Sequence, residues 1–75
     1  MKVTVKLIGP LIYAAGFSEK EITLPGSAAA KDLFARIKLD KKRPVIITRN
    51  GHAISAADRL SEGDRVVISP LYSGG

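Results

Sequence analysis

The chain has 75 residues, 45% of them hydrophobic, and twelve Lys and Arg against seven Asp and Glu give a formal net charge of +5. This length allows one small core, because such a chain buries only about 60% of the surface that its unfolded form exposes. The lack of cysteine and the single histidine, His52, exclude disulfides, a thiol nucleophile and a metal site of thiolates or clustered imidazoles.

The N-terminal segment predicts a strand instead of a signal peptide. From Lys2 to Leu7, polar and apolar residues alternate, as in a strand with one wet and one buried side. Gly9-Pro10 ends this strand, and the apolar connection from Leu11 to Phe17 is too short to predict a helix. No apolar run approaches the roughly 18 residues of a membrane span. We therefore expect a soluble, cytoplasmic protein without a membrane partner.

A second strand and one helix follow. The segment from Glu19 to Leu24 predicts a strand with Ile22 and Leu24 on its inward side, and Pro25-Gly26 closes it with a turn. Ser27 is placed as the N-cap of the helix. The helix is indicated by an apolar stripe at helical spacing, which consists of Ala30, Leu33, Phe34 and Ile37.

Positive charge is concentrated just after this helix. The cluster consists of Lys38, Lys41, Lys42 and Arg43. Cations suit the negative end of a helix dipole. A base-stacking surface needs aromatic residues among its cations, whereas the aromatic residues here lie elsewhere in the sequence. We interpret the cluster as a solvated face at a helix end, which argues against a nucleic-acid partner.

Two strands joined by a tight turn are predicted next. Pro44 prevents continuation of the helix, and Val45–Arg49 is apolar enough for a central strand. Asn50-Gly51 predicts a type I′ turn, because both central positions of that turn need positive φ. The returning strand begins at His52, which places this histidine beside the turn at the surface.

The last strand follows one expected helical turn. That turn covers residues 55–60 and points Leu60 inward. Arg65–Ser69 has the β-branched composition of a strand, and Pro70 removes a backbone donor, which predicts the end of the ladder.

A flexible tail is expected over residues 70–75. Fully extended, it reaches roughly 20 Å at about 3.3 Å per residue. Gly74 and Gly75 have no Cβ, so they fit a channel too narrow for other residues, and Gly75 offers an unhindered carboxylate.

The order strand, strand, helix, strand, short strand, strand predicts an α+β fold. In this arrangement one main helix packs on one face of a mixed sheet of four to five strands. A last strand that runs parallel beside the first lies in the centre of the sheet. This is the β-grasp, or ubiquitin-like, fold, and we expect it to occupy residues 1–75 as a single domain.

On these residues the chain resembles the ubiquitin-like sulfur carrier proteins, which comprise the small subunit of molybdopterin synthase and the thiamine-pathway carrier. The resemblance extends over the whole length and is most specific in the passage from Leu60 to Val66 and in Gly74-Gly75. The Gly9-Pro10-Leu11 connection and the tail favour the molybdopterin-type subunit. Two departures from the family are the basic charge and the aromatic Tyr72 in the tail.

The resemblance implies a carrier that is not itself an enzyme. An ATP-dependent adenylyltransferase of the ubiquitin-activating type would adenylate Gly75, which then becomes a thiocarboxylate, and Gly74 would provide steric clearance. The carrier would bind no cofactor or metal, since ATP is used by the activating enzyme. Its tail would then enter a larger catalytic subunit, which is the large subunit of molybdopterin synthase or, alternatively, thiazole synthase.

Two other functions remain: a protein modifier joined to lysines through Gly75, which shares all of these features, and a β-grasp module that binds RNA through its basic face and does not need Gly74-Gly75. For a protein partner we expect contacts from apolar residues of the sheet face and from the tail. These candidates are Leu11, Ile12, Tyr13, Pro70, Leu71, Tyr72 and Ser73. Internal packing explains Leu11, Ile12, Tyr13 and Leu71 equally well.

Overall fold

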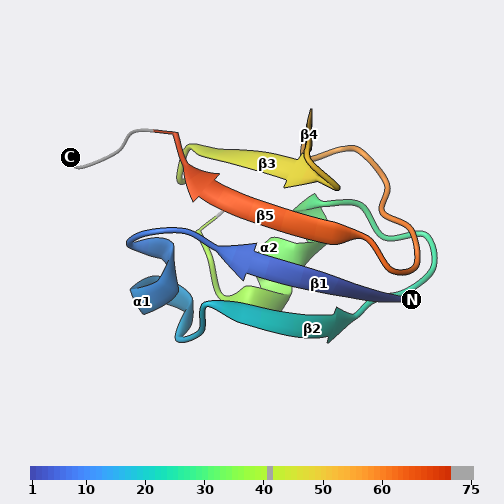
Figure 1. Ribbon diagram of the computed structural model, residues 1–75, viewed down its shortest axis with the longest axis horizontal. Helices are drawn as coiled ribbons and strands as arrows, with labels where there is room; N and C mark the ends of the chain where they lie inside the picture. The colour runs from blue at the N-terminus through green and yellow to red at the C-terminus, as the bar shows by residue number, and fades with distance from the viewer. Residues whose placement is uncertain (41, 72–75) are drawn as a thin grey trace.

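The computed structural model describes residues 1–40 and 42–71, which form five strands and two helices. In chain order these are β1 (Lys2–Leu7), α1 (Leu11–Ala15), β2 (Glu19–Thr23), α2 (Lys31–Ile37), β3 (Val45–Arg49), β4 (His52–Ile54) and β5 (Arg65–Pro70). The helix α2 covers one face of the sheet, and α1 lies at the end of the sheet where β1 finishes and β2 begins (Figure 1). Neither of these helices has the length and apolar character needed to cross a membrane.

The strands form one mixed sheet in the order β2-β1-β5-β3-β4. The strands β1 and β5 are parallel, with Val5 opposite Val66, and the other neighbouring strands are antiparallel. The last strand therefore lies at the centre of the sheet, between β1 and β3. This sheet with one main helix on one face is the β-grasp fold, and the α+β prediction is confirmed.

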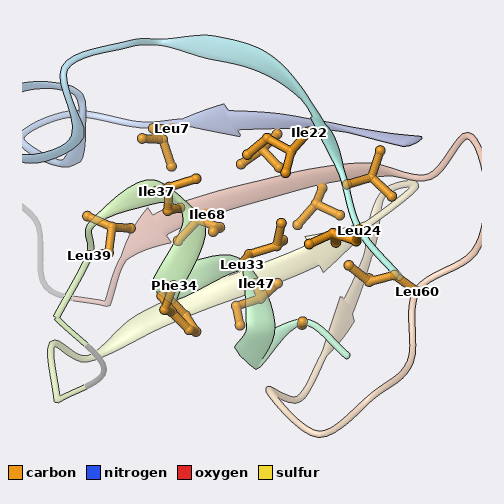
Figure 2. Close-up of a cluster of buried hydrophobic side chains, with 14 of the residues drawn as sticks. Leu7, Ile22, Leu24, Leu33, Phe34, Ile37, Leu39, Ile47, Leu60 and Ile68 are labelled. Carbon is orange, nitrogen blue, oxygen red and sulfur yellow. The ribbon is translucent and has the colours of Figure 1, made fainter. Parts of the chain in front are cut away.

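The core lies between the sheet and α2. Alternate residues of β1 and β5 face the helix, and all are at most 1% exposed: Val3, Val5, Leu7, Val66 and Ile68. The predicted helical stripe is confirmed, since Ala30, Leu33, Phe34 and Ile37 are all buried. Figure 2 shows Leu33, Phe34 and Ile37 packed against Ile47 and Ile68 of the sheet. Burial of each large side chain contributes about 1.5–3 kcal/mol.

The turn between β3 and β4 has the predicted geometry. Asn50 and Gly51 have φ angles of 50° and 87°, which a type I′ turn requires and which glycine adopts without steric cost. The turn places Arg49 opposite His52, and the side chain of His52 is exposed, as expected.

The connection after β1 contains a short helix that the sequence did not predict. In α1, Leu11 is fully buried, and Gly16 ends the helix with a φ of 88° and donates its N–H to the carbonyl oxygen of Ile12 at 2.8 Å. Isolated helices of this length are unstable in water, so packing of Leu11 into the core stabilises α1.

Ser27 is not the N-cap of α2, so this prediction is wrong. Ser27 lies in a turn before the helix, which begins only at Lys31. Ala30 occupies the cap position without a side-chain bond, and the Asp32 carboxylate instead accepts a hydrogen bond from the N–H of Ala29 at 2.8 Å. A carboxylate in the first turn also suits the positive end of the helix dipole.

Residues 55–60 form a turn at Ala56 and Ala57, followed by a bend and an isolated bridge from Arg59 to Ala29, instead of the expected helical turn. The N–H of Asp58 donates to the carbonyl oxygen of Ser55 at 3.1 Å, and the N–H of Ser55 donates to Oδ2 of Asp58 at 2.8 Å. This local pairing satisfies the backbone without a helix. Leu60 is buried, as predicted.

Candidate functional site

The C-terminal tail begins at the end of the central strand β5. Pro70 is the last residue of β5 and lies opposite Val45 of β3, so the pairing of these two strands includes Pro70. The next N–H, that of Leu71, donates to the carbonyl oxygen of Pro44 at 3.1 Å. Proline fits here because Pro70 and Val45 form a non-hydrogen-bonded pair, in which the missing N–H is not needed by β3. We call Pro70 and Leu71 the tail root; Tyr72, Ser73, Gly74 and Gly75 lie outside the described residues.

The strand that carries the tail root is held at its other end by side-chain hydrogen bonds. Oδ1 of Asn50 accepts the N–H of Arg65 at 2.9 Å, and Nδ2 of Asn50 donates to Oδ1 of Asp64 at 3.1 Å. The other oxygen of Asp64 accepts the N–H of Ser61 at 2.7 Å. Asp64 is only 7% exposed, so these bonds offset the cost of burying its carboxylate. The tail root therefore extends from a strand that is anchored at both ends.

The residues expected to contact a partner differ in how exposed they are in the structure. Leu11 is 0% exposed and belongs to the core, so its assignment as a docking residue is corrected. Ile12 is partly buried against the core, whereas Tyr13 is 88% exposed. At the tail root, Pro70 is half-buried and Leu71 is 48% exposed. Tyr13 and Leu71 are therefore the described candidates that a partner can reach most easily.

A second group of accessible apolar residues lies on the face of the sheet opposite α2. Ile8 donates its N–H to the carbonyl oxygen of Ile68 at 3.1 Å, which places Ile8 beside Ser69. Ile46 lies opposite Ser69, and Ile8 and Ile46 are 38% and 40% exposed. Val67 lies on the same face and is partly exposed. Leu71 follows Ser69 by two residues and binds Pro44 in continuation of the β3–β5 pairing, which puts it on this face as well. We call Ile8, Ile46, Val67 and Leu71 the open-face cluster.

Sequence reasoning missed three members of this cluster. The run Val45-Ile46-Ile47 is apolar at every position, so it does not show which residues face away from the helix. Val67 and Ile8 do continue the alternation of their strands on the solvent side, and this pattern was the available signal. An apolar solvent-facing group beside a candidate reactive tail is typical of a docking surface.

The same sheet face carries ion pairs over β1, β2 and the start of β5. Nη2 of Arg65 lies 3.1 Å from Oε1 of Glu19, and Nζ of Lys2 lies 3.9 Å from Oε1 of Glu21. All four side chains are largely exposed, so these pairs contribute little to stability. The open face therefore carries the apolar cluster around β5 and β3 and charged side chains over β1 and β2, where Lys6 lies opposite Val67 and Glu19 lies opposite Lys6.

A shallow groove of about 280 Å³ beside α2 lies away from the tail root. One of its lining residues is Leu24, which directly follows β2. The end of β2 pairs with Lys2 at the start of β1, whereas Pro70 lies at the other end of the sheet. Its charged residues already have backbone partners, because Asp32 accepts the N–H of Ala29 and Arg36 donates to the carbonyl oxygen of Thr23. Across residues 1–40 and 42–71, no three His, Asp or Glu side chains gather as a metal-binding group.

Comparison with known proteins links this geometry to one family. The sequence model of the ThiS family matches residues 5–75. No curated protein sequence gives a significant match. A Pyrococcus furiosus protein named as subunit 1 of molybdopterin converting factor is 30% identical, with a TM-score of 0.82. The alignment covers 96% of this chain and 99% of that protein.

Two further solved structures share the fold at lower identity. SAMP1 from Haloferax volcanii is 22% identical with a TM-score of 0.82, and the alignment covers all of both chains. A chain from the complex of subunits 1 and 2 of the molybdopterin-converting factor from Helicobacter pylori is 23% identical with a TM-score of 0.68 over all of both chains. At these identities the likeness supports the fold alone.

Proposed function

Because the chain belongs to the ThiS family, we propose that it is a sulfur carrier whose C-terminal Gly75 is adenylated and converted to a thiocarboxylate that donates sulfur in cofactor biosynthesis. The observation that carries this proposal is the family match, which extends over residues 5–75 and so includes Gly74-Gly75. The tail root supports it, because β5 delivers the chain to the end of the sheet beside the open-face cluster.

The proposed reaction has two steps. A carboxylate oxygen of Gly75 attacks the α-phosphorus of ATP, and pyrophosphate leaves. Sulfide then attacks the carbonyl carbon of the acyl adenylate, and AMP leaves, which yields the thiocarboxylate. The activating enzyme supplies the catalytic groups, since this chain has no cysteine and its one histidine, His52, lies at the opposite end of β3 from the tail root. The chain is then a co-substrate and not an enzyme.

The length of the tail suits delivery into a partner. The four residues after Leu71 reach about 13 Å when extended, at about 3.3 Å per residue. Gly75 therefore enters a cleft while the tail root and the open-face cluster remain outside it. The two glycines minimise steric hindrance near the reacting carbonyl carbon.

The proposed partners are an ATP-dependent activating enzyme and then a larger catalytic subunit, both of which dock on the open-face cluster. The name of the Pyrococcus furiosus relative favours molybdopterin synthesis, in which the second partner is the large subunit of molybdopterin synthase. The Helicobacter pylori complex of subunits 1 and 2 supplies a precedent for such a pairing. Thiamine thiazole synthesis is the alternative pathway.

Mass spectrometry of the chain after activation tests this proposal. The purified chain is incubated with ATP, sulfide and the adenylating enzyme from the same cells, while pyrophosphate release is measured. We expect pyrophosphate release and replacement of one oxygen by sulfur at Gly75. Absence of adenylation contradicts the proposal. Isopeptide adducts with other proteins, without sulfur at Gly75, instead indicate a protein modifier.

A further inference from the structure

The connection between α2 and β3 places cations beside the tail root. Pro44 accepts the hydrogen bond from Leu71, and Lys42 and Arg43 immediately precede Pro44 in the chain. Figure 1 shows this connection at the same end of the sheet as the C-terminal end of β5. Together with Lys38, which ends α2, Lys42 and Arg43 form a set that we call the basic loop.

The backbone of the basic loop is held by local bonds and by the core. The N–H of Lys42 donates to Oδ1 of Asp40 at 2.9 Å, and the N–H of Arg43 donates to the carbonyl oxygen of Asp40 at 3.1 Å. Leu39 is only 7% exposed and lies near Ile37 in the core (Figure 2). These contacts keep Lys42 and Arg43 next to the tail root while their side chains stay exposed.

The basic loop differs from several other basic residues of the chain in having no acceptor within the described part of the structure. Arg65 and Lys2 pair with Glu19 and Glu21, and Arg36 donates to the carbonyl oxygen of Thr23. By contrast, Lys38, Lys42 and Arg43 have no carboxylate within ion-pair distance among residues 1–40 and 42–71. Asp40 lies in the same segment, but the structure uses its Oδ1 for the N–H of Lys42. The positive charge here is therefore available to a partner.

We infer that the basic loop binds an acidic protein surface at the mouth of the cleft that receives the tail; this inference rests on the proposed function. When Gly75 lies inside a cleft, the rim of that cleft is within about 13 Å of Leu71, because the four residues after Leu71 extend no further at about 3.3 Å per residue. Leu71 binds Pro44, so Lys42 and Arg43, which directly precede Pro44, lie close to that rim. Opposite charges separated by less than about 8–10 Å still attract each other at physiological salt, because screening is incomplete over that distance. Carboxylates on the rim therefore orient the carrier as its tail enters.

The composition of the basic loop favours a protein over a nucleic acid. No aromatic residue lies between Lys38 and Pro44, so this segment has no ring on which a base can stack. The tail root, in contrast, adds the exposed apolar side chain of Leu71, whose N–H binds Pro44 next to Arg43 in the chain. An apolar centre with a charged rim is the usual composition of a protein interface.

Charge reversal in the basic loop tests the inference. The variant K42E/R43E replaces two side chains that are exposed in the structure, and it retains the backbone N–H groups that bind Asp40. The matched control is K31E/R59E, which changes the net charge equally at two exposed residues away from the tail root. ATP–pyrophosphate exchange is measured with the adenylating enzyme from the same cells while the carrier concentration is varied. We expect K42E/R43E to raise the half-saturating concentration about tenfold at low salt, with an unchanged maximal rate, and K31E/R59E to leave both unchanged.

Salt dependence gives a second readout. Between about 50 mM and about 300 mM NaCl, the half-saturating concentration of the wild type should rise more steeply than that of K42E/R43E. Equal behaviour of the two double variants overturns the inference and leaves the proposed function intact. Failure of the wild type to support exchange overturns both. Loss of binding to a labelled single-stranded RNA in K42E/R43E, with normal exchange, also overturns the inference. If K42E/R43E does not fold, K42Q/R43Q serves in the same assays.

Discussion

Nδ2 of Asn50 donates a hydrogen bond to Oδ1 of Asp64 at 3.1 Å, which joins the turn between β3 and β4 to the residue before β5. The same Asn50 side chain accepts the N–H of Arg65 at 2.9 Å. A hairpin turn residue thus holds the start of the strand whose other end carries the tail root.

Removal of the Asp64 carboxylate should lower the stability of the fold. In Asp64→Ala the side-chain amide of Asn50 and the N–H of Ser61 lose their acceptors, and we expect the free energy of unfolding to fall by about 2 kcal/mol. Urea unfolding measures this change. The control Asp58→Ala removes an exposed carboxylate that accepts one N–H and should lose less than about 1 kcal/mol. Equal losses contradict the special role of Asp64.

A charge in the open-face cluster should weaken partner binding without unfolding the chain. Ile46 is 40% exposed, so Ile46→Lys should change the free energy of unfolding by less than about 1 kcal/mol. We expect it to raise the half-saturating concentration in ATP–pyrophosphate exchange about tenfold. Ala53→Lys is the control, because it adds the same charge to the same sheet face on the edge strand β4. A similar loss in both variants argues that added charge alone is responsible.

The two sides of α1 should respond differently to truncation. Leu11 is fully buried, so Leu11→Ala should cost about 3 kcal/mol of unfolding free energy. Tyr13 is 88% exposed, and Tyr13→Ala should stay within about 0.5 kcal/mol of the wild type. Urea unfolding compares them directly. If Tyr13→Ala reduces exchange at unchanged stability, α1 also contacts the partner; an unchanged half-saturating concentration removes Tyr13 from the docking surface.

Deletion of Gly74-Gly75 should separate folding from function. The described core ends within β5, so we expect the free energy of unfolding to change by no more than about 0.5 kcal/mol. Adenylation should be lost, because the new acyl end is Ser73, which has a side chain and is roughly 7 Å short of the original reach at about 3.3 Å per residue. Gly74→Ala should reduce the rate more mildly. Pyrophosphate release from the deletion variant at the wild-type rate contradicts the proposal that Gly75 reacts.

Local patterns in the sequence were sufficient for most of the fold. The alternation from Lys2 to Leu7 predicted β1, and the stripe through Leu33 and Phe34 predicted the buried face of α2. Asn50-Gly51 predicted its turn, because positive φ at two successive positions is a backbone requirement that few residue pairs meet. These features depend on neighbouring residues, so the sequence alone contains them.

Other features depend on contacts between distant segments. Leu11 was a docking candidate in the sequence, but it is buried because α1 folds back onto the core. Ser27 had the composition of an N-cap, but the helix begins at Lys31, where Asp32 binds the preceding backbone. At the start of α2, the N–H groups of Ala30 and Lys31 also bind the carbonyl oxygens of Asp58 and Ala56, and these distant contacts outweigh an N-cap preference of about 1 kcal/mol.

The candidate site shows the same division. Gly74-Gly75 and Leu71 were recognised from the sequence as parts of a tail, since their position and composition suffice. The open-face cluster required the register of β1, β3 and β5, which brings Ile8 and Ile46 to either side of Ser69. The sequence predicts only a solvated helix end for the cations after α2, whereas the bond between Leu71 and Pro44 puts Lys42 and Arg43 close to the tail root. Only strand pairing joins these segments, because it depends on the complementarity of two distant stretches and not on either stretch alone.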